Sequence, residues 1–293
     1  MSIVRLPAAC IYSLNCVIGV IGNSIMITCF MKNQKFRSPC HILITLLCFC
    51  DCLNLCGANF YAFGLFADWS ISQSTCYFIQ IVPIFGSSMG TSLILMIGID
   101  RFAAILCPLK YRLIETKLTS YVSVLLMFPF LFAMSILYFG FQYKDDTQVF
   151  CNLPASLNGA FQIFLFGSVF INLGVFSVYS GVYLSLKIHE TSSQLKKVFH
   201  SIALTVVLVL LGWVTTTVWC IVTVEFVSDL ELIEILNMYA GIPMECSLTT
   251  NVFVFYFINS DYRKTIRTLL GFSSISNSTA LDSTAKVSPS SVV

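Results

Sequence analysis

Charged residues are unusually scarce in this chain. Asp, Glu, Lys and Arg make up 10% of its 293 residues, whereas an ordinary globular protein carries about 25%. So small a charged fraction argues against a soluble all-helical protein. Histidine is also scarce, and His41, His189 and His200 lie far apart in the chain. Because catalysis needs a cluster of such groups, we expect a protein that is not an enzyme and has no nucleic-acid partner.

Internal repeats are missing as well. Repeated halves, broken helices and several buried ionisable groups are typical of transporters. Here only Asp51 and Glu245 place a charge inside the long apolar stretches. A transporter or channel therefore stays only as an alternative. The segments between the stretches are too short for a second domain. The first apolar run is too long for a cleavable signal peptide and lacks a basic leader.

Long apolar stretches, in contrast, fill most of the chain. A helix needs about 20 apolar residues to cross the ~30 Å hydrocarbon layer, and its backbone must satisfy its own hydrogen bonds there. The sequence therefore predicts an all-α membrane protein, a seven-transmembrane helix bundle in the lipid bilayer. The predicted helices run roughly over 7–31, 39–66, 76–99, 118–141, 157–186, 201–224 and 236–258.

The basic residues divide between the two sides of this bundle. Fourteen of the sixteen lie in alternate connecting segments and the tail, and only Arg5 and Lys144 lie on the other side. Short basic loops stay in the cytoplasm, so we predict a multi-pass plasma membrane protein with its N-terminus outside and its C-terminus cytoplasmic. Residues 260–271 predict an amphipathic helix lying on the inner leaflet. Residues 1–271 would form one receptor-sized domain, and the Ser/Thr-rich tail 272–293 is predicted to be disordered.

Most of the 13 cysteines fall inside predicted helices, where a thiol is a small apolar filler. Cys76 and Cys151 stand apart. Cys76 lies at the outer mouth of the third helix, and Cys151 lies in the outer loop between the fourth and fifth. Both would face the oxidising side, where disulfides persist. We predict that they bond and tie this loop over the bundle.

An acid and an arginine end the third helix. From Cys76 to Arg101 is 25 residues, or ~38 Å of helix, which places Asp100 and Arg101 together at the inner membrane face. Arg101 could pair with Asp100 at rest and meet a cytoplasmic partner when the bundle opens. A boundary salt bridge that only anchors the helix is the alternative.

Several short motifs together resemble a known family. The chain is similar to rhodopsin-like G-protein-coupled receptors, and most similar to the nematode serpentine chemoreceptors of class Srsx. The matching runs are Gly19-Val20-Ile21-Gly22-Asn23, Leu47 with Asp51, Gly98-Ile99-Asp100-Arg101-Phe102 with Pro108 and Tyr111, Asn251-Val252-Phe253-Val254-Phe255-Tyr256, and Ser260-Asp261-Tyr262-Arg263. The resemblance implies coupling to a heterotrimeric G protein through Asp100, Arg101, Pro108 and Tyr111.

The chain also departs from the family pattern. Phe102 replaces the motif tyrosine, and Val252 replaces the proline expected after Asn251. The sixth helix reads Gly212-Trp213-Val214-Thr215 and lacks its usual bend-forming proline. No acid stands at its inner end to hold Arg101; Lys196, Lys197 and His200 lie there instead. We infer a weaker resting lock on Arg101.

A carboxylate in mid-membrane is costly and indicates function. By resemblance, Asp51 belongs to an internal polar network with Asn23, Asn251, Ser247 and Tyr256. In many relatives this network holds sodium. Gly90 stands where a relative's serine would help bind the ion, so two interpretations stay open: a sodium ion at Asp51, or a polar relay without it.

Glu245 lies six residues, or ~9 Å, outward from Asn251. That depth is where the family binds ligands, and no basic residue lies in any predicted helix core to pair with it. Glu245 is therefore a candidate ligand-binding residue, and a protonated structural glutamic acid is the alternative. Gly86 and Gly90, four residues apart, indicate close helix packing.

These observations predict a chemosensory G-protein-coupled receptor that detects an odorant or other small molecule. Ligand binding outside would activate a G protein inside. A neuropeptide-type receptor is the alternative within the class, since the acidic outer loops would suit a basic peptide. The Srsx resemblance also implies a sensory neuron cilium. No cofactor is expected apart from the sodium ion.

Overall fold

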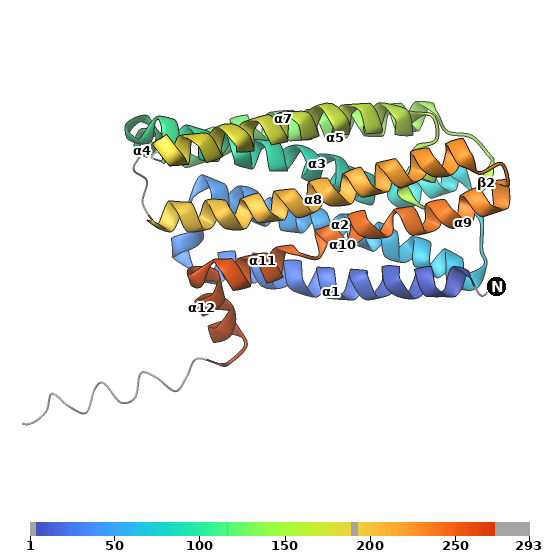
Figure 1. The fold of residues 1–293 in the computed structure, drawn as a ribbon, viewed down its shortest axis with the longest axis horizontal. Coiled ribbons are helices and arrows are strands. Elements are labelled where there is room, and N and C mark those ends of the chain that lie inside the picture. Colours follow the sequence, from blue (N-terminus) through green and yellow to red (C-terminus); the bar gives the residue numbers. More distant parts are fainter. Residues whose placement is uncertain (1–3, 116, 189–192, 273–293) are drawn as a thin grey trace, which may run out of the picture.

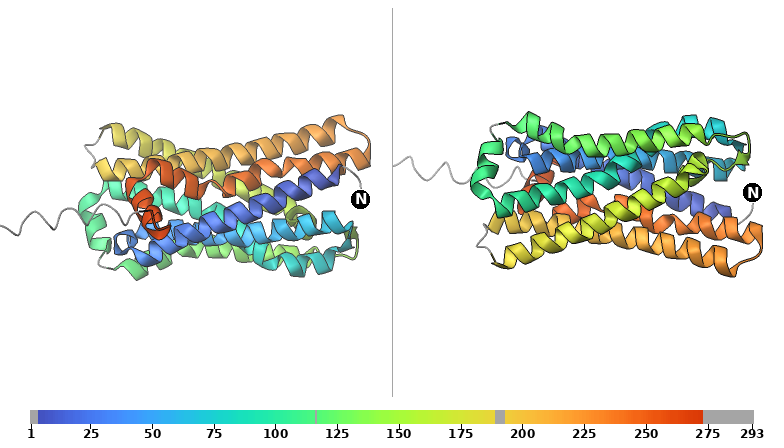
Figure 2. Two further views of the ribbon diagram at one scale, coloured as in Figure 1. Left: turned by 90° about the horizontal axis from the view of Figure 1, so that it is seen from below. Right: turned by 90° about the horizontal axis from the view of Figure 1, so that it is seen from above.

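The computed structural model describes residues 4–115, 117–188 and 193–272, and almost all of them lie in helices. Six of these helices are long and apolar enough to cross a membrane. They are α1 (Arg5–Lys32), α2 (Pro39–Ala67), α3 (Gln73–Leu106), α5 (Leu118–Gln142), α7 (Ala160–Ile188) and α8 (Ser193–Phe226). They run along a common axis as an elongated bundle (Figures 1 and 2). The predicted disordered tail lies outside the described residues except for Phe272.

The predicted helix over 236–258 needs correction, because it is three consecutive helices. These are α9 (Leu230–Ala240), α10 (Ile242–Leu248) and α11 (Asn251–Ile258). Gly241 and Pro243 lie at the first break, and Pro243 has no N–H to continue the ladder. At the second break the hydroxyls of Thr249 and Thr250 donate to the carbonyls three residues back, an alternative to helical pairing.

The fifth predicted stretch, 157–186, begins later than expected. Residues Leu153–Leu157 form a separate short helix, α6, and α7 starts at Ala160. Between them Asn158 has a positive φ of 48°, which Asn tolerates better than most residues and which ends a helix. The sequence pattern alone did not separate these two elements because both are apolar.

Short elements mark the two ends of the bundle. The strands β1 (Ile71–Ser72) and β2 (Gln148–Val149) pair antiparallel, with Ile71 opposite Val149. They lie at the same end as the N-terminus (Figure 1). We call it the disulfide end, because Cys76 and Cys151 lie there. The opposite end, the Arg101 end, carries the 3-10 helix Gln34–Phe36, α4 (Pro108–Glu115) and α12 (Ser260–Leu269).

The predicted amphipathic helix is α12. The side chain of Asn259 caps it by accepting from the N–H groups of Asp261 and Tyr262. Tyr262 and Ile266 are buried, and the Tyr262 ring stacks on Phe36 with centroids 4.2 Å apart. One face of the helix is thus fixed to the bundle, and contact of the other with the bilayer stays a prediction.

The centre and the outside of the bundle differ from those of a soluble protein. The middle helix, α3, packs against α2, α5 and α7. Large apolar side chains cover the outer surface; Leu14, Val124, Phe170, Phe176 and Val214 are all more than half exposed. Apolar area on this scale would be a liability in water. It is what a surface in contact with lipid requires.

Candidate functional site

At the Arg101 end, three side chains form a closed hydrogen-bonded group. Arg101 Nε donates to Asp100 Oδ2 at 2.9 Å, and Arg101 Nη2 donates to the Tyr111 hydroxyl at 2.9 Å. The hydroxyl in turn donates to Asp100 Oδ1 at 2.9 Å. Asp100, Arg101 and Tyr111 are all buried. We call this group the Arg101 triad. Hydrogen bonds to charged groups are the stronger kind, so the triad holds Arg101 against its own helix.

The connection after α3 places Tyr111. Pro108 opens α4, where its missing N–H costs nothing, and Tyr111 follows one turn later. Burial raises the pKa of Tyr111, so the phenol stays neutral and both donates and accepts. Pro108 itself is exposed and takes no part in the triad. Its predicted role in coupling stays a prediction.

The triad has no acidic partner from α8. Within the described chain, the Arg101 side chain donates hydrogen bonds to Asp100 and Tyr111. His200 is exposed near the start of α8, and the side chains of Lys196 and Lys197 lie outside the description. Arg101 is thus held by Asp100 of its own helix and by Tyr111 of α4, and the weaker resting lock inferred from the sequence stays a prediction.

In the middle of the bundle, three predicted residues meet. Asn251 Nδ2 donates to Asp51 Oδ2 at 2.7 Å and to Asn23 Oδ1 at 3.2 Å. Asn23 Nδ2 donates to the carbonyl of Leu248 at 3.2 Å. The network therefore joins α1, α2 and the break between α10 and α11. That break frees the Leu248 carbonyl for a side chain.

Two residues assigned to this network make hydrogen bonds outside it. The Ser247 hydroxyl donates to the carbonyl of Met244. Tyr256 lies at the Arg101 end, where its hydroxyl accepts from Arg267 Nε at 3.2 Å. Helical geometry explains this correction. Phe255, four residues after Asn251, lies on the same face of α11 and is buried. Tyr256, one residue later, points away from that face.

A small cavity of about 20 Å³ borders Asp51. Its lining includes the hydroxyl residue Ser87, whose buried Oγ has no hydrogen-bond partner among the described residues. Gly90 leaves room here, since a Cβ added to it would lie 3.8 Å from Asp51 Oδ1. A carboxylate and a hydroxyl oxygen at one cavity of this size fit a single water or a small cation.

At the disulfide end, the predicted bond is confirmed. Cys76 and Cys151 form a disulfide with their Cα atoms 5.3 Å apart. Further hydrogen bonds hold the loop: Gln73 Nε2 donates to the carbonyl of Ser156, and its Oε1 accepts from the N–H of Asp145. The Thr147 hydroxyl and N–H both donate to Asp145 and hold the pKa of its carboxyl below the usual range.

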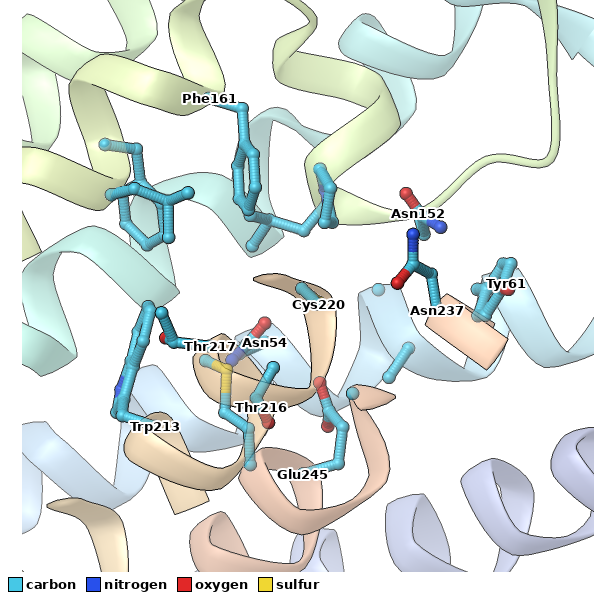
Figure 3. A pocket seen from close by; sticks show the side chains of 18 of the residues that line it. Asn54, Tyr61, Asn152, Phe161, Trp213, Thr216, Thr217, Cys220, Asn237 and Glu245 are labelled. Carbon is cyan, nitrogen blue, oxygen red and sulfur yellow. The ribbon is translucent and has the colours of Figure 1, made fainter. Parts of the chain in front are cut away.

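Beneath this loop lies a cavity of about 280 Å³, which we call the upper cavity. Its walls come from α1, α2, α3, α6, α7, α8, α9 and α10. Figure 3 shows the Glu245 side chain reaching toward the space between Trp213, Phe161 and Asn237. The polar residues that line it are Tyr12, Asn54, Tyr61, Gln80, Asn152, Thr216, Thr217, Cys220, Asn237 and Glu245. The predicted ligand residue Glu245 thus lines a real cavity.

Three buried oxygens at this cavity have no hydrogen-bond partner among the described residues. They are Gln80 Oε1, Asn237 Oδ1 and Glu245 Oε2. A buried acceptor without a donor costs about 1–3 kcal/mol, so a bound molecule that donates to these oxygens, whether water or ligand, is stabilised here. Sequence reasoning found Glu245 but missed Gln80 and Asn237. Isolated amides within apolar runs were the available signal.

Only the first glycine of the Gly86–Gly90 pair makes a close contact between helices. A Cβ on Gly86 would lie 2.7 Å from the carbonyl oxygen of Cys50 and 2.8 Å from Leu53 Cβ, so α2 and α3 touch there. A Cβ on Gly90 would meet nothing closer than 3.6 Å. The second glycine therefore opens space beside Asp51.

The fold and these three sites define a class of protein, a helical membrane receptor with a cavity at one end and a buried arginine at the other. Comparison with known proteins agrees. Residues 16–270 match the serpentine type 7TM GPCR chemoreceptor Srsx family, and the chain belongs to that family. It is thus a G-protein-coupled receptor.

Individual relatives are more distant. The chain is 24% identical over 282 residues to human C-C chemokine receptor type 4, covering 87% of this chain and 75% of the relative. It is 32% identical over 114 residues to human lysophosphatidic acid receptor 4 and 29% identical over 108 residues to human G-protein coupled receptor 183. These two matches span only 30% and 29% of those receptors.

Proposed function

We propose that this receptor is chemosensory and that a small molecule binds in the upper cavity. The observation that carries the proposal is the cavity itself, closed over by the disulfide-tied loop and lined by unsatisfied acceptors. Its volume of about 280 Å³ lies at the lower end of the range for small-molecule pockets. It favours an odorant-sized ligand over the peptide of a neuropeptide receptor.

The orientation follows from charge and redox state together. The disulfide end faces outward, since disulfides persist there, and the basic Arg101 end faces the cytoplasm. In this arrangement α9, α10 and α11 together form the seventh crossing. The receptor then resides in the plasma membrane, and the family resemblance favours the membrane of a sensory cilium.

Signalling passes between the two ends by a shift of populations. The ligand favours a state only by binding it better than the other. In the resting state the Arg101 triad is closed. In the active state the cytoplasmic ends of α7, α8 and α11 move away, the triad opens, and Arg101 and the α4 segment contact a heterotrimeric G protein.

The central network is the proposed relay. Asn251 joins Asp51 to Asn23 across the second break of the seventh segment. The cavity beside Asp51 would hold a sodium ion in the resting state, with Asp51 and Ser87 as ligands. A network with water in place of sodium is the alternative, and the sodium dependence of stability separates the two.

The test is a G-protein dissociation assay in cells that express the receptor. A panel of odorants and peptides is applied to wild type and to Arg101→Ala at matched surface levels. We expect a response to a small molecule that is lost in Arg101→Ala. A response to peptides alone would favour the neuropeptide receptor. A ligand-gated current that survives Arg101→Ala without G-protein dissociation would overturn the proposal in favour of a channel or transporter.

A further inference from the structure

We infer that the ligand of the upper cavity is a small organic cation, a protonated amine on an otherwise apolar molecule, and that Glu245 is its counter-ion. The inference rests on the proposed function, because it assumes that this cavity is the ligand site. Four features of the described structure support it: charge, the engagement of nearby cations, the acceptors and the aromatic wall.

The cavity has one acidic residue. Among the described residues that line it, Glu245 is the only Asp or Glu, and no Lys, Arg or His borders the space. Its Oε2 is buried without a hydrogen-bond partner. An unpaired carboxylate is costly in an apolar setting, so the side chain favours its neutral acid form in the empty cavity and its carboxylate form when a cation binds beside it.

The basic side chains at this end are engaged elsewhere. Arg5 pairs with Asp68 and lies over the Phe150 ring, 4.5 Å from its centroid. Lys144 lies over the rings of Phe141 and Phe78, 3.6 and 4.7 Å from their centroids. The protein therefore supplies no cation to Glu245 from these positions, and the ligand can supply one.

The remaining lining complements an ammonium group. Gln80 Oε1 and Asn237 Oδ1 are acceptors without donors, and an ammonium carries up to three N–H groups. The aromatic wall is continuous: the rings of Phe161 and Phe164 are 6.1 Å apart, and those of Phe164 and Trp213 are 5.8 Å apart. Such faces attract a cation and also bury an apolar body. An anion would find an acid and several acceptors but no positive group.

The charge of the cavity is testable before any ligand is known. Cys220 lines the upper cavity and is free. We would compare the rates at which Cys220 reacts with two methanethiosulfonates, one trimethylammonium-ethyl and one sulfonato-ethyl, each normalised to its rate with a free thiol in solution. The full chain is held in lipid nanodiscs, and mass spectrometry of the Cys220 peptide reads the modification. Cys220→Ser provides the blank.

Three receptors are compared: wild type, Glu245→Gln and Glu245→Asp. The rates are measured over a pH series that extends into the alkaline range, where Glu245 is ionised. A nearby unit charge alters such rates in opposite directions for the two reagents, so we expect a cation preference at Cys220 that reaches at least about tenfold as Glu245 ionises. Glu245→Gln should abolish it, and Glu245→Asp should keep most of it. Equal rates in wild type, or a preference unchanged in Glu245→Gln, would overturn the inference. So would failure of the cationic reagent to react with Cys220.

A signalling screen separates this inference from the proposed function. Small amines and their neutral isosteres are compared in the G-protein assay on wild type and Glu245→Gln. We expect amines to act on wild type with at least about tenfold loss of potency in Glu245→Gln. A neutral or anionic agonist whose potency is the same on wild type and Glu245→Gln would refute the inference of a cationic ligand, while the receptor function would stand. A cation-selective cavity without any G-protein response would instead refute the function.

Discussion

The Tyr111 hydroxyl offers a direct way to loosen the Arg101 triad. It makes two hydrogen bonds, one from Arg101 Nη2 and one to Asp100 Oδ1, both 2.9 Å long. Tyr111→Phe removes both and leaves the ring in place. A hydrogen bond to a charged group contributes about 1.5–3 kcal/mol. Arg101 and Asp100 remain bonded to one another through Arg101 Nε, and water compensates part of the loss, so we expect a net change of about 1–3 kcal/mol.

This change should appear as basal signalling. If the closed triad belongs to the resting state, the substitution shifts the resting-to-active equilibrium by roughly 5- to 150-fold. Basal G-protein dissociation without ligand should therefore rise, up to the ceiling set by full activation. Asp100→Asn should raise it further, because it removes the charge that holds Arg101.

The assay compares basal dissociation at matched surface expression, with Tyr138→Phe as the control. Tyr138 lies on α5 and is 61% exposed, so loss of its hydroxyl should change nothing. Basal activity of Tyr111→Phe equal to that of wild type would refute the argument that this hydroxyl restrains Arg101. Lower basal activity would mean that the triad belongs to the active state.

Three further predictions concern stability, each read from thermal unfolding of the purified receptor. Cys151→Ser should lower the free energy of unfolding by about 2–4 kcal/mol, because the disulfide joins residues 75 positions apart. Cys10→Ser, at an exposed free thiol, is the control. Equal melting temperatures of the two variants would contradict the prediction. Gly86→Ala should destabilise by about 1–3 kcal/mol, since its Cβ would overlap α2. Gly90→Ala should be tolerated, and the reverse order would contradict the packing described. If sodium binds at Asp51, replacing choline chloride by sodium chloride should raise the melting temperature of wild type but not of Asp51→Asn. An equal rise in both would contradict a sodium site at Asp51 and favour the polar relay without sodium.

Much of this architecture could be predicted because the bilayer restricts what the sequence can do. Apolar stretches long enough to cross it predicted six of the helices, although α3 runs on to Leu106 beyond the predicted end at 99 and α8 begins at Ser193 before the predicted start at 201. The position of Cys76 at a helix mouth and of Cys151 in the following outer loop was enough to predict their bond. In each case the signal was local and the physical constraint was strong.

The features that the sequence did not reveal depend on the direction in which a side chain points and on how the helices pack around it. Tyr256 was assigned to the central network by its place in a motif, but a shift of one residue turns it about 100° around the helix. Among the described residues, the cavity oxygens of Gln80 and Asn237 lack partners because of how the surrounding helices pack. No pattern in one segment reports which acceptors stay unsatisfied when all segments have packed.

The interrupted seventh segment connects these features. Its first break, at Gly241, directly precedes α10, which carries Glu245 into the upper cavity, and its second break exposes the Leu248 carbonyl to Asn23. The short helix α10 thus lies between the cavity and the central network, with a break at each end. A seven-residue helix held by two breaks can tilt or shift as a unit more easily than part of a long continuous helix. Ligand contact with Glu245 would therefore act on Asn251 through α10, and the sixth helix, which lacks the usual proline bend, need not supply the motion.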